Sequence, residues 1–299
     1  MKKPWWVQFY QDSRKTAAAE AYAAFVRDCA AAPEQNRLRE SAGRAGPYPA
    51  GLGGGWRYRC RRLPVHGRLQ NAYGLKEIAG QGETFERALR VMDWLCAHTY
   101  YKGVSFGASM RFGRSPYRGG WGNSLRMLRY ACGRPIARSL NCGYIGIVLA
   151  DCLVAAGIAA MPVNMINYIY RAGEEKTKLF PNHTVVHVWL PEERRWVMLD
   201  PSLDSYISDE TGRALHLIEI HERRRKGQEI RVAQYALNRT QDCRDVYLDY
   251  FVLGSLLEIL VWNDSSRKGA YLRLLPEDVP TKESRIVTAA ELLAEPKYE

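Results

Sequence analysis

The 299-residue sequence has no uninterrupted apolar run of the roughly 20 residues that a membrane-spanning helix needs. Its first residues include two lysines but no sustained apolar stretch and no small-residue cleavage site, so no secretory signal is expected. It also lacks a Cys-x-x-Cys pair, the close ligand spacing that is typical of zinc sites. These absences argue against a membrane-spanning, secreted or zinc-binding protein. We therefore expect a cytoplasmic protein with no metal and no cofactor.

The sequence has seven cysteines, an odd number, and with no secretory signal we do not expect them to form disulfides. Reduced thiols in a cytosol are the simplest account of them, and most should be small buried hydrophobic residues. Hydrophobic residues make up 46% and charged residues 25% of the chain. These values are typical of a folded protein and exclude a mostly disordered one.

Acidic residues are missing between Trp94 and Ala150, and that stretch is rich in arginine. Basic residues also cluster within residues 57–68 and 221–226, and the net charge is +11. Such clusters attract anions, including acidic protein segments and nucleic acid, although solvated arginines with no partner are an equal alternative. The acid-free stretch leads into the cysteine discussed below, so it predicts an acidic substrate. Its candidate contacts are Arg118, Arg126 and Arg138.

The succession of patterns predicts an α+β protein with five segments. These are an N-terminal helical segment, a Gly/Pro-rich linker, a basic segment, a catalytic core and a mostly helical C-terminal extension, over residues 1–40, 41–56, 57–83, 84–210 and 211–299.

Helices are predicted over Thr84–Tyr100 and Ser124–Ala131, and a third between the capping residue Asn141 and Gly157. A strand rich in β-branched residues follows the third helix. The alternating segments HTVVHVWL and RWVMLD, joined by PEER, then predict a β-hairpin. The order from Asn141 to Asp200 is thus helix, strand, strand, strand.

A further apolar segment, Asp245–Trp262, contains Asp249, Gly254 and Glu258. It is too short and too interrupted to span a membrane, and we predict a buried helix there.

Cys142 has the sequence setting of a reactive cysteine. It follows Asn141, so it lies in the first turn of the predicted helix. There the unpaired backbone N–H groups and the positive end of the helix dipole stabilise a thiolate. The basic stretch before it acts in the same direction.

The hairpin can supply the base and the orienting carboxylate that a cysteine nucleophile needs. In a strand, residues two apart share a face, so His183 and His187 point the same way. With the turn centred on PEER, Asp200 lies opposite Val185 and diagonal to both histidines. The pattern therefore leaves His183 and His187 as alternative bases.

Three phrases, namely Cys142 with YIGIVLADCLVAAGIAAMPV, then NHTVVHVW, then RWVMLDPS, resemble the core of the transglutaminase-like superfamily, a papain-related group of Cys-His-Asp enzymes. The resemblance covers about Thr84 to Asp204. It implies a nucleophile at the N-terminus of a helix that packs on an antiparallel sheet. It also implies Cys142 as nucleophile, His183 as base and Asp200 as the orienting residue. His183 is favoured over His187 because the family histidine begins its strand.

The chemistry expected from this triad is acyl transfer on an amide bond through a thioester, with hydrolysis favoured over transamidation. The expected substrate is a protein or peptide. The oxyanion would be held by the backbone N–H of Cys142 and a second donor, for which Trp121 and Asn123 are candidates. The alternative is a catalytically inactive transglutaminase-like module that binds an acidic partner or nucleic acid. Nucleic acid is disfavoured, because no RNP, helix-turn-helix or zinc-finger pattern occurs.

Overall fold

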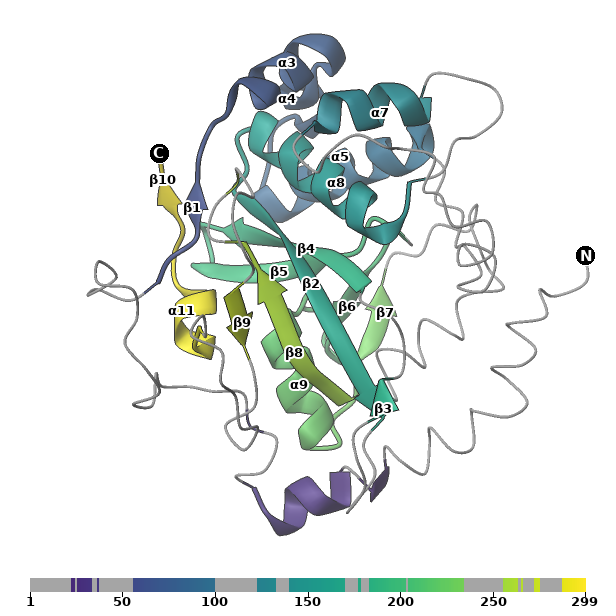
Figure 1. Ribbon diagram of the computed structural model, residues 1–299, viewed down its shortest axis with the longest axis vertical. Coiled ribbons are helices and arrows are strands. Elements are labelled where there is room, and N and C mark those ends of the chain that lie inside the picture. The colour runs from purple at the N-terminus through teal and green to yellow at the C-terminus, as the bar shows by residue number, and fades with distance from the viewer. Residues whose placement is uncertain are drawn as a thin grey trace, which may run out of the picture.

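The computed structural model describes residues 23–24, 26–33, 37, 56–99, 123–132, 140–169, 177–178, 183–202, 204–233, 255–262, 265, 272–274 and 287–299, and the statements below concern these residues. They form an α+β fold, as the sequence predicts, in which a layer of helices lies on one face of an antiparallel sheet (Figure 1).

The central sheet has six strands, in the order β5-β4-β2-β8-β9 with β3 paired to β2. Its members are β2 (Ala160–Ile169), β3 (Thr177–Lys178), β4 (His183–Leu190), β5 (Arg195–Leu199), β8 (Ser255–Val261) and β9 (Leu272–Leu274). The hairpin β4–β5 has the expected register, with Leu190 opposite Arg195 and Val186 opposite Leu199. This register fixes which side chains of the two strands can meet.

The helical layer consists of α3 (Pro64–Tyr73), α4 (Leu75–Ala79), α5 (Thr84–His98), α7 (Ser124–Cys132) and α8 (Cys142–Ala155). The three helices predicted in this region are confirmed as α5, α7 and α8. α8 ends where expected, and Gly157 just beyond it has a φ of 86°, a left-handed conformation that glycine adopts without strain.

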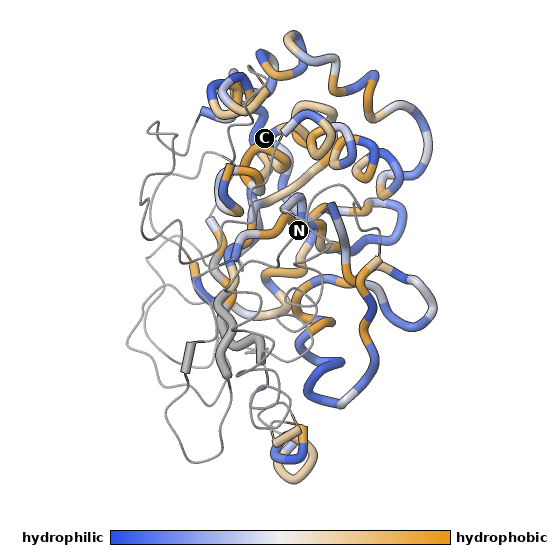
Figure 2. Tube along the Cα trace, turned by 90° about the vertical axis from the view of Figure 1, so that its right-hand side faces the viewer, coloured by the Kyte–Doolittle hydropathy of each residue, from blue (hydrophilic) through white to orange (hydrophobic). Residues whose placement is uncertain are grey.

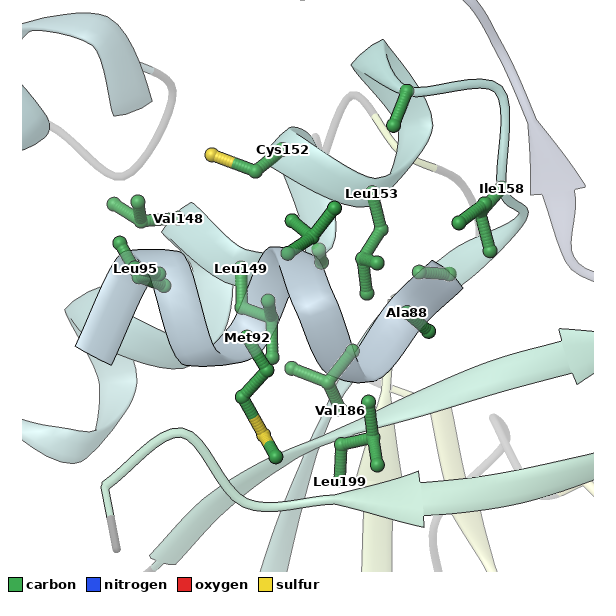
Figure 3. Packing of buried hydrophobic residues seen from close by; sticks show 14 of the residues in the cluster. Ala88, Met92, Leu95, Val148, Leu149, Cys152, Leu153, Ile158, Val186 and Leu199 are labelled. Atoms are coloured by element: carbon green, nitrogen blue, oxygen red, sulfur yellow. The ribbon is translucent and has the colours of Figure 1, made fainter. Parts of the chain in front are cut away.

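The main hydrophobic core lies between this layer and the sheet. Met92 of α5 and Leu149 of α8 pack toward Val186 of β4 and Leu199 of β5 (Figure 3). Hydrophobic and hydrophilic residues are interleaved along much of the chain (Figure 2). α8 differs, because it is buried from Ile145 to Ala155 and is therefore largely apolar on all sides.

A second core covers the opposite face of the sheet, where Trp189, Trp196 and Met198 pack with Leu217. This face is covered by α9 (Leu217–Arg225) and α11 (Ala289–Leu293) (Figure 1). Two short ribbons complete the fold. The antiparallel one pairs β6 (Tyr206–Ser208) with β7 (Arg231–Ala233), and the parallel one pairs β1 (Arg59–Cys60) with β10 (Lys297–Tyr298).

The helix predicted for Asp245–Trp262 is wrong over its described part. Ser255–Val261 is strand β8, which pairs with β2 on one side and β9 on the other. A short apolar run fits a buried strand as well as a buried helix, and pairing with β2 decides for the strand. The C-terminal extension over residues 211–299, expected to be mostly helical, therefore supplies strands to the central sheet.

The N-terminal helix is seen at residues 23–24 and 26–31, as expected. The basic cluster at residues 221–226 is not a solvated anion-binding patch. Arg224 and Arg225 are buried, and Arg225 pairs with Glu222 and donates to the carbonyl of Pro33. Arg225 thereby links α9 to the segment that follows the N-terminal helix.

Candidate active site

Cys142 is the first residue of α8, and Asn141 caps this helix. The Asn141 side chain accepts a hydrogen bond from the backbone N–H of Tyr144 at 2.9 Å. The first N–H groups of a helix have no acceptor within it, so those of Cys142 and Gly143 lie at the positive end of the α8 dipole. The half-buried thiol of Cys142 lies in the same turn.

The sulfur of Cys142 lies against the beginning of β4. The last pair between β4 and β5 joins Val186 to Leu199, so β5 does not extend alongside Thr184. The backbone N–H of Thr184 donates to the Cys142 sulfur instead. The staggered end of the hairpin thus provides a backbone donor that stabilises a thiolate.

Gly146 allows α8 to approach β4 this closely. A Cβ at this position would lie 2.9 Å from the Cγ2 of Thr184, inside van der Waals contact. Thr184 is buried and β-branched, so its methyl group has little freedom to move away. The missing side chain of Gly146, one turn after Cys142, therefore helps to set the distance between the sulfur and β4.

We expect Gly146→Ala to push α8 away from β4, which should lower the free energy of unfolding by about 1–3 kcal/mol and raise the pKa of Cys142. Thr184→Ser removes the clashing methyl group, so the double variant should recover most of both losses. Urea unfolding and the pH midpoint of Cys142 alkylation measure the two effects. A double variant as impaired as Gly146→Ala would show that this contact is not the cause.

His183 joins the sulfur to a buried carboxylate. Its Nε2 lies 2.7 Å from the Oδ2 of Asp200, and its side chain also hydrogen-bonds to Cys142. Since Nε2 is taken by Asp200, the ring nitrogen that meets the sulfur is Nδ1. The His183 side chain is 13% exposed and that of Asp200 is fully buried, which shields their interaction from water.

Asp200 is held in place from several directions. Its Oδ1 accepts a hydrogen bond from the backbone N–H of Ser202 at 2.8 Å, and its backbone pairs with Ser205. The buried thiol of Cys96 donates to the carbonyl of Pro201 at 3.3 Å, which ties this turn to α5. The carboxylate that faces His183 is therefore fixed in orientation.

The surroundings of Cys142 and His183 favour the thiolate form of the cysteine and the imidazolium form of the histidine. Burial by itself would raise the pKa of the Cys142 thiol, but the hydrogen bond and charge of His183 and the N–H of Thr184 outweigh it, so that the pKa is lowered. Burial likewise opposes a charge on His183, but the charge and hydrogen bond of Asp200 raise the pKa of His183 to about 10. The geometry therefore favours the ionised form of the Cys142 sulfur more than an ordinary cysteine environment does.

His187 occupies a different environment, although it is also diagonal to Asp200. It is fully buried, and its Nε2 accepts a hydrogen bond from the backbone N–H of Leu217 at 3.4 Å. Burial and the nearby His216 lower the pKa of His187 to about 3. The structure thus brings His183, and not His187, to Asp200 and Cys142.

Of the remaining predicted site residues, the structure describes Asn123 and Arg126. Trp121, Arg118 and Arg138 lie outside the described residues. Asn123 caps α7, its Oδ1 accepting from the backbone N–H of Arg126, and Arg126 is exposed on that helix.

The start of α7 lies beside the middle of α8. Ser124, the residue after Asn123, donates to Asp151, which is nine residues beyond Cys142 and hence about 13 Å farther along the helix. The contact between Ser124 and Asp151 therefore does not bring Asn123 or Arg126 to the Cys142 sulfur.

Asp151 belongs to a second serine, aspartate and histidine cluster, with Ser124 and His66, which sequence reasoning missed. His66 Nε2 lies 3.2 Å from Asp151, and its Nδ1 accepts from the backbone N–H of Leu63. The serine donates to the carboxylate and not to the imidazole, and all three side chains are buried. This cluster is a polar tie between α3, α7 and α8, not a catalytic group.

Within the described ranges, no three His, Cys, Asp or Glu side chains gather as a metal site. The same residues include no helix that is both long and apolar enough to traverse a bilayer. Comparison of the sequence with protein-family models gave no match, and comparison with curated proteins gave none either. We therefore infer the function from the geometry of the site.

Proposed function

We propose that this protein is an enzyme that transfers the acyl group of an amide through a thioester on Cys142. His183 acts as base and acid, and Asp200 orients it. The observation that carries the proposal is the connected series in which a buried carboxylate lies 2.7 Å from His183 and His183 hydrogen-bonds to a cysteine at a helix N-terminus. Each of these features stabilises the ionised form of the sulfur.

In the first half of the reaction, the Cys142 thiolate adds to the amide carbonyl and forms a C–S bond. The carbonyl oxygen becomes an oxyanion. The His183 imidazolium donates its Nδ1 proton to the leaving nitrogen as the C–N bond breaks. This step yields a thioester, a free amine and a neutral imidazole.

In the second half, His183 takes a proton from water as the water oxygen attacks the thioester. Breakage of the C–S bond releases a carboxylic acid and restores the thiolate and the imidazolium. An amine in place of water would give transamidation. Hydrolysis is the simpler proposal, because no site for an acceptor amine is recognised in the sequence.

The oxyanion can be bound by the backbone N–H groups of Cys142 and Gly143. Asn141 accepts from the N–H of Tyr144, and the N–H groups of Cys142 and Gly143 lie in the same first turn, where a helix binds an anionic oxygen. This pair replaces Asn123 as the proposed donor set, since Asn123 caps α7.

The arrangement agrees with what the resemblance to transglutaminase-like enzymes implies, since a cysteine at the start of a helix faces a histidine that begins an antiparallel strand. The finer proposal is a papain-related core that acts on a protein or peptide in a cytoplasmic setting. An acidic substrate remains part of it, because the acid-free stretch of the sequence adjoins Cys142.

The proposal is tested by the alkylation rate of Cys142 as a function of pH, with peptide mapping to separate the cysteines. The midpoint should lie well below the value of about 8.5 for an ordinary cysteine. Cys132 is an internal control. This residue is exposed to the reagent, and partial desolvation of its thiol raises its pKa. A midpoint for Cys142 as high as that for Cys132 would support an inactive binding module instead.

Trapping of the intermediate completes the test. Incubation with glutamine- and peptide-amide probes should add the acyl mass to the native chain and not to Cys142→Ala. A reactive thiolate that never acquires an acyl group from any probe would argue against amide chemistry.

A further inference from the structure

Asn164 is a buried polar side chain that the fold leaves without a partner for one of its atoms. It lies in β2 and is 8% exposed, and no described residue donates to its buried Oδ1. In the unfolded chain this oxygen is hydrated, so burying it unpaired destabilises the folded protein. Such a group calls for a donor that the described residues do not supply.

Asn164 lies close to the candidate active site. It pairs with Thr184 of β4, and paired residues of an antiparallel sheet project on the same face, with Cβ atoms about 5 Å apart. Thr184 faces α8, since its methyl group lies 2.9 Å from where a Cβ of Gly146 would be. The N–H of this same Thr184 holds the Cys142 sulfur. Asn164 is therefore on the helix-facing side of the sheet, one strand away from the residue that anchors the nucleophile.

The surroundings of Asn164 make a purely structural amide an unfavourable choice. Apart from Thr184, the core residues named on this face of the sheet are apolar, as with Ala160, Val186 and Val188. A side chain with no polar atoms would avoid the unpaired oxygen at this position. An amide kept at such a cost is typical of a functional site.

We propose that Asn164 binds the substrate, its Oδ1 accepting a hydrogen bond from an N–H group of an amide. This inference rests on the proposed function and adds a specificity to it. A carbonyl oxygen pairs with an N–H donor and repels a carboxylate. A site built to bind an N–H discriminates against a substrate that lacks it, because the buried acceptor is then left unpaired. Asn164 thus selects substrates that present an N–H over matching ones that do not.

The test measures binding in the full chain carrying Cys142→Ala, so that turnover does not intervene. The probe is a blocked glutamine peptide, compared with counterparts in which one N–H at a time is methylated or the side-chain amide is replaced by its methyl ester. One of these changes should weaken binding about 10-fold with Asn164 present. Asn164→Leu should weaken binding of the unmodified peptide by a similar factor. In this variant the unmodified peptide and the modified one should bind equally well.

Stability provides the second measurement, because a structural amide and a substrate-binding amide differ in it. The melting temperature of Asn164→Leu should be unchanged or higher, since an unpaired acceptor has been removed. The pH midpoint of Cys142 alkylation should stay where it is in the native chain.

The outcomes separate the inference from the proposed function. If no methylated or ester probe shows coupling to Asn164, or if Asn164→Leu only lowers the melting temperature, the inference is overturned whatever the activity. If Cys142 is an ordinary thiol but the coupling is found, the site binds amides without catalysing their cleavage. In that case the proposed function fails and the inference stands.

Discussion

Replacing His183 by glutamine should lower amide turnover about 10³-fold and raise the pKa of Cys142 above that of an ordinary cysteine. Burial opposes ionisation of the sulfur, and His183 supplies the main opposing hydrogen bond and charge. Without the imidazole, burial dominates and the thiol keeps its proton at neutral pH. The measurements are the steady-state rate on an amide probe and the alkylation midpoint of Cys142.

His187→Gln is the matched control for this prediction. His187 is in the same strand, but it is fully buried and bonded to the backbone of Leu217. Its replacement should lower the free energy of unfolding and leave the alkylation midpoint of Cys142 unchanged. If the His187 variant shifted the midpoint and the His183 variant did not, the assignment of the base would be wrong.

The pH dependence of turnover follows from the same pair. Below the lowered pKa of Cys142 the sulfur is protonated and cannot attack. Above the pKa of His183, about 10, the imidazole has no proton to give to the leaving nitrogen. We therefore expect a bell-shaped profile whose acid limb lies below the pKa of an ordinary cysteine and whose alkaline limb lies near pH 10. In His183→Gln, the acid limb should move upward.

The local part of the site could be predicted from the sequence. Asn141 before an apolar repeat predicts the start of α8, and two alternating segments around PEER predict the hairpin and its register. Cys142 lies at the start of the predicted helix, and His183 and Asp200 lie in the predicted hairpin that follows it. Signals of this kind depend on neighbours along the chain, which the sequence contains directly.

The choice between His183 and His187 could not be derived from the hairpin, because both are diagonal to Asp200. It depends on where α8 begins over the sheet, which is a tertiary contact made through Gly146 and Thr184. The strand β8 escaped prediction for a related reason, since pairing with β2 decides its conformation. What the sequence does not reveal here is which distant segments pack together.

Replacing Asp200 by asparagine should lower turnover by a factor of about 10³, because the carboxylate serves two donors and a carboxamide has one oxygen. Oδ1 accepts the N–H of Ser202, and Oδ2 accepts the Nε2–H of His183. An asparagine that keeps the bond to Ser202 turns its NH₂ group toward Nε2. The imidazole must then carry its proton on Nδ1, and no negative charge stabilises an imidazolium. The pKa of His183 should fall from its raised value, which the alkaline limb of the pH profile measures.

Asp204→Asn tests whether the position of the charge matters and not merely its presence. Asp204 follows in the same turn, where its φ of 52° places the backbone in the left-handed region that asparagine also tolerates. It is Asp200, four residues earlier, whose carboxylate meets His183. This variant should therefore keep the native turnover and the native alkaline limb, with both variants assayed well below their melting temperatures. An equal loss in the two variants would mean that the turn as a whole, and not the Asp200 carboxylate, supports His183. Loss in Asp200→Asn alone would tie the raised pKa of the imidazole to one oxygen atom 2.7 Å away.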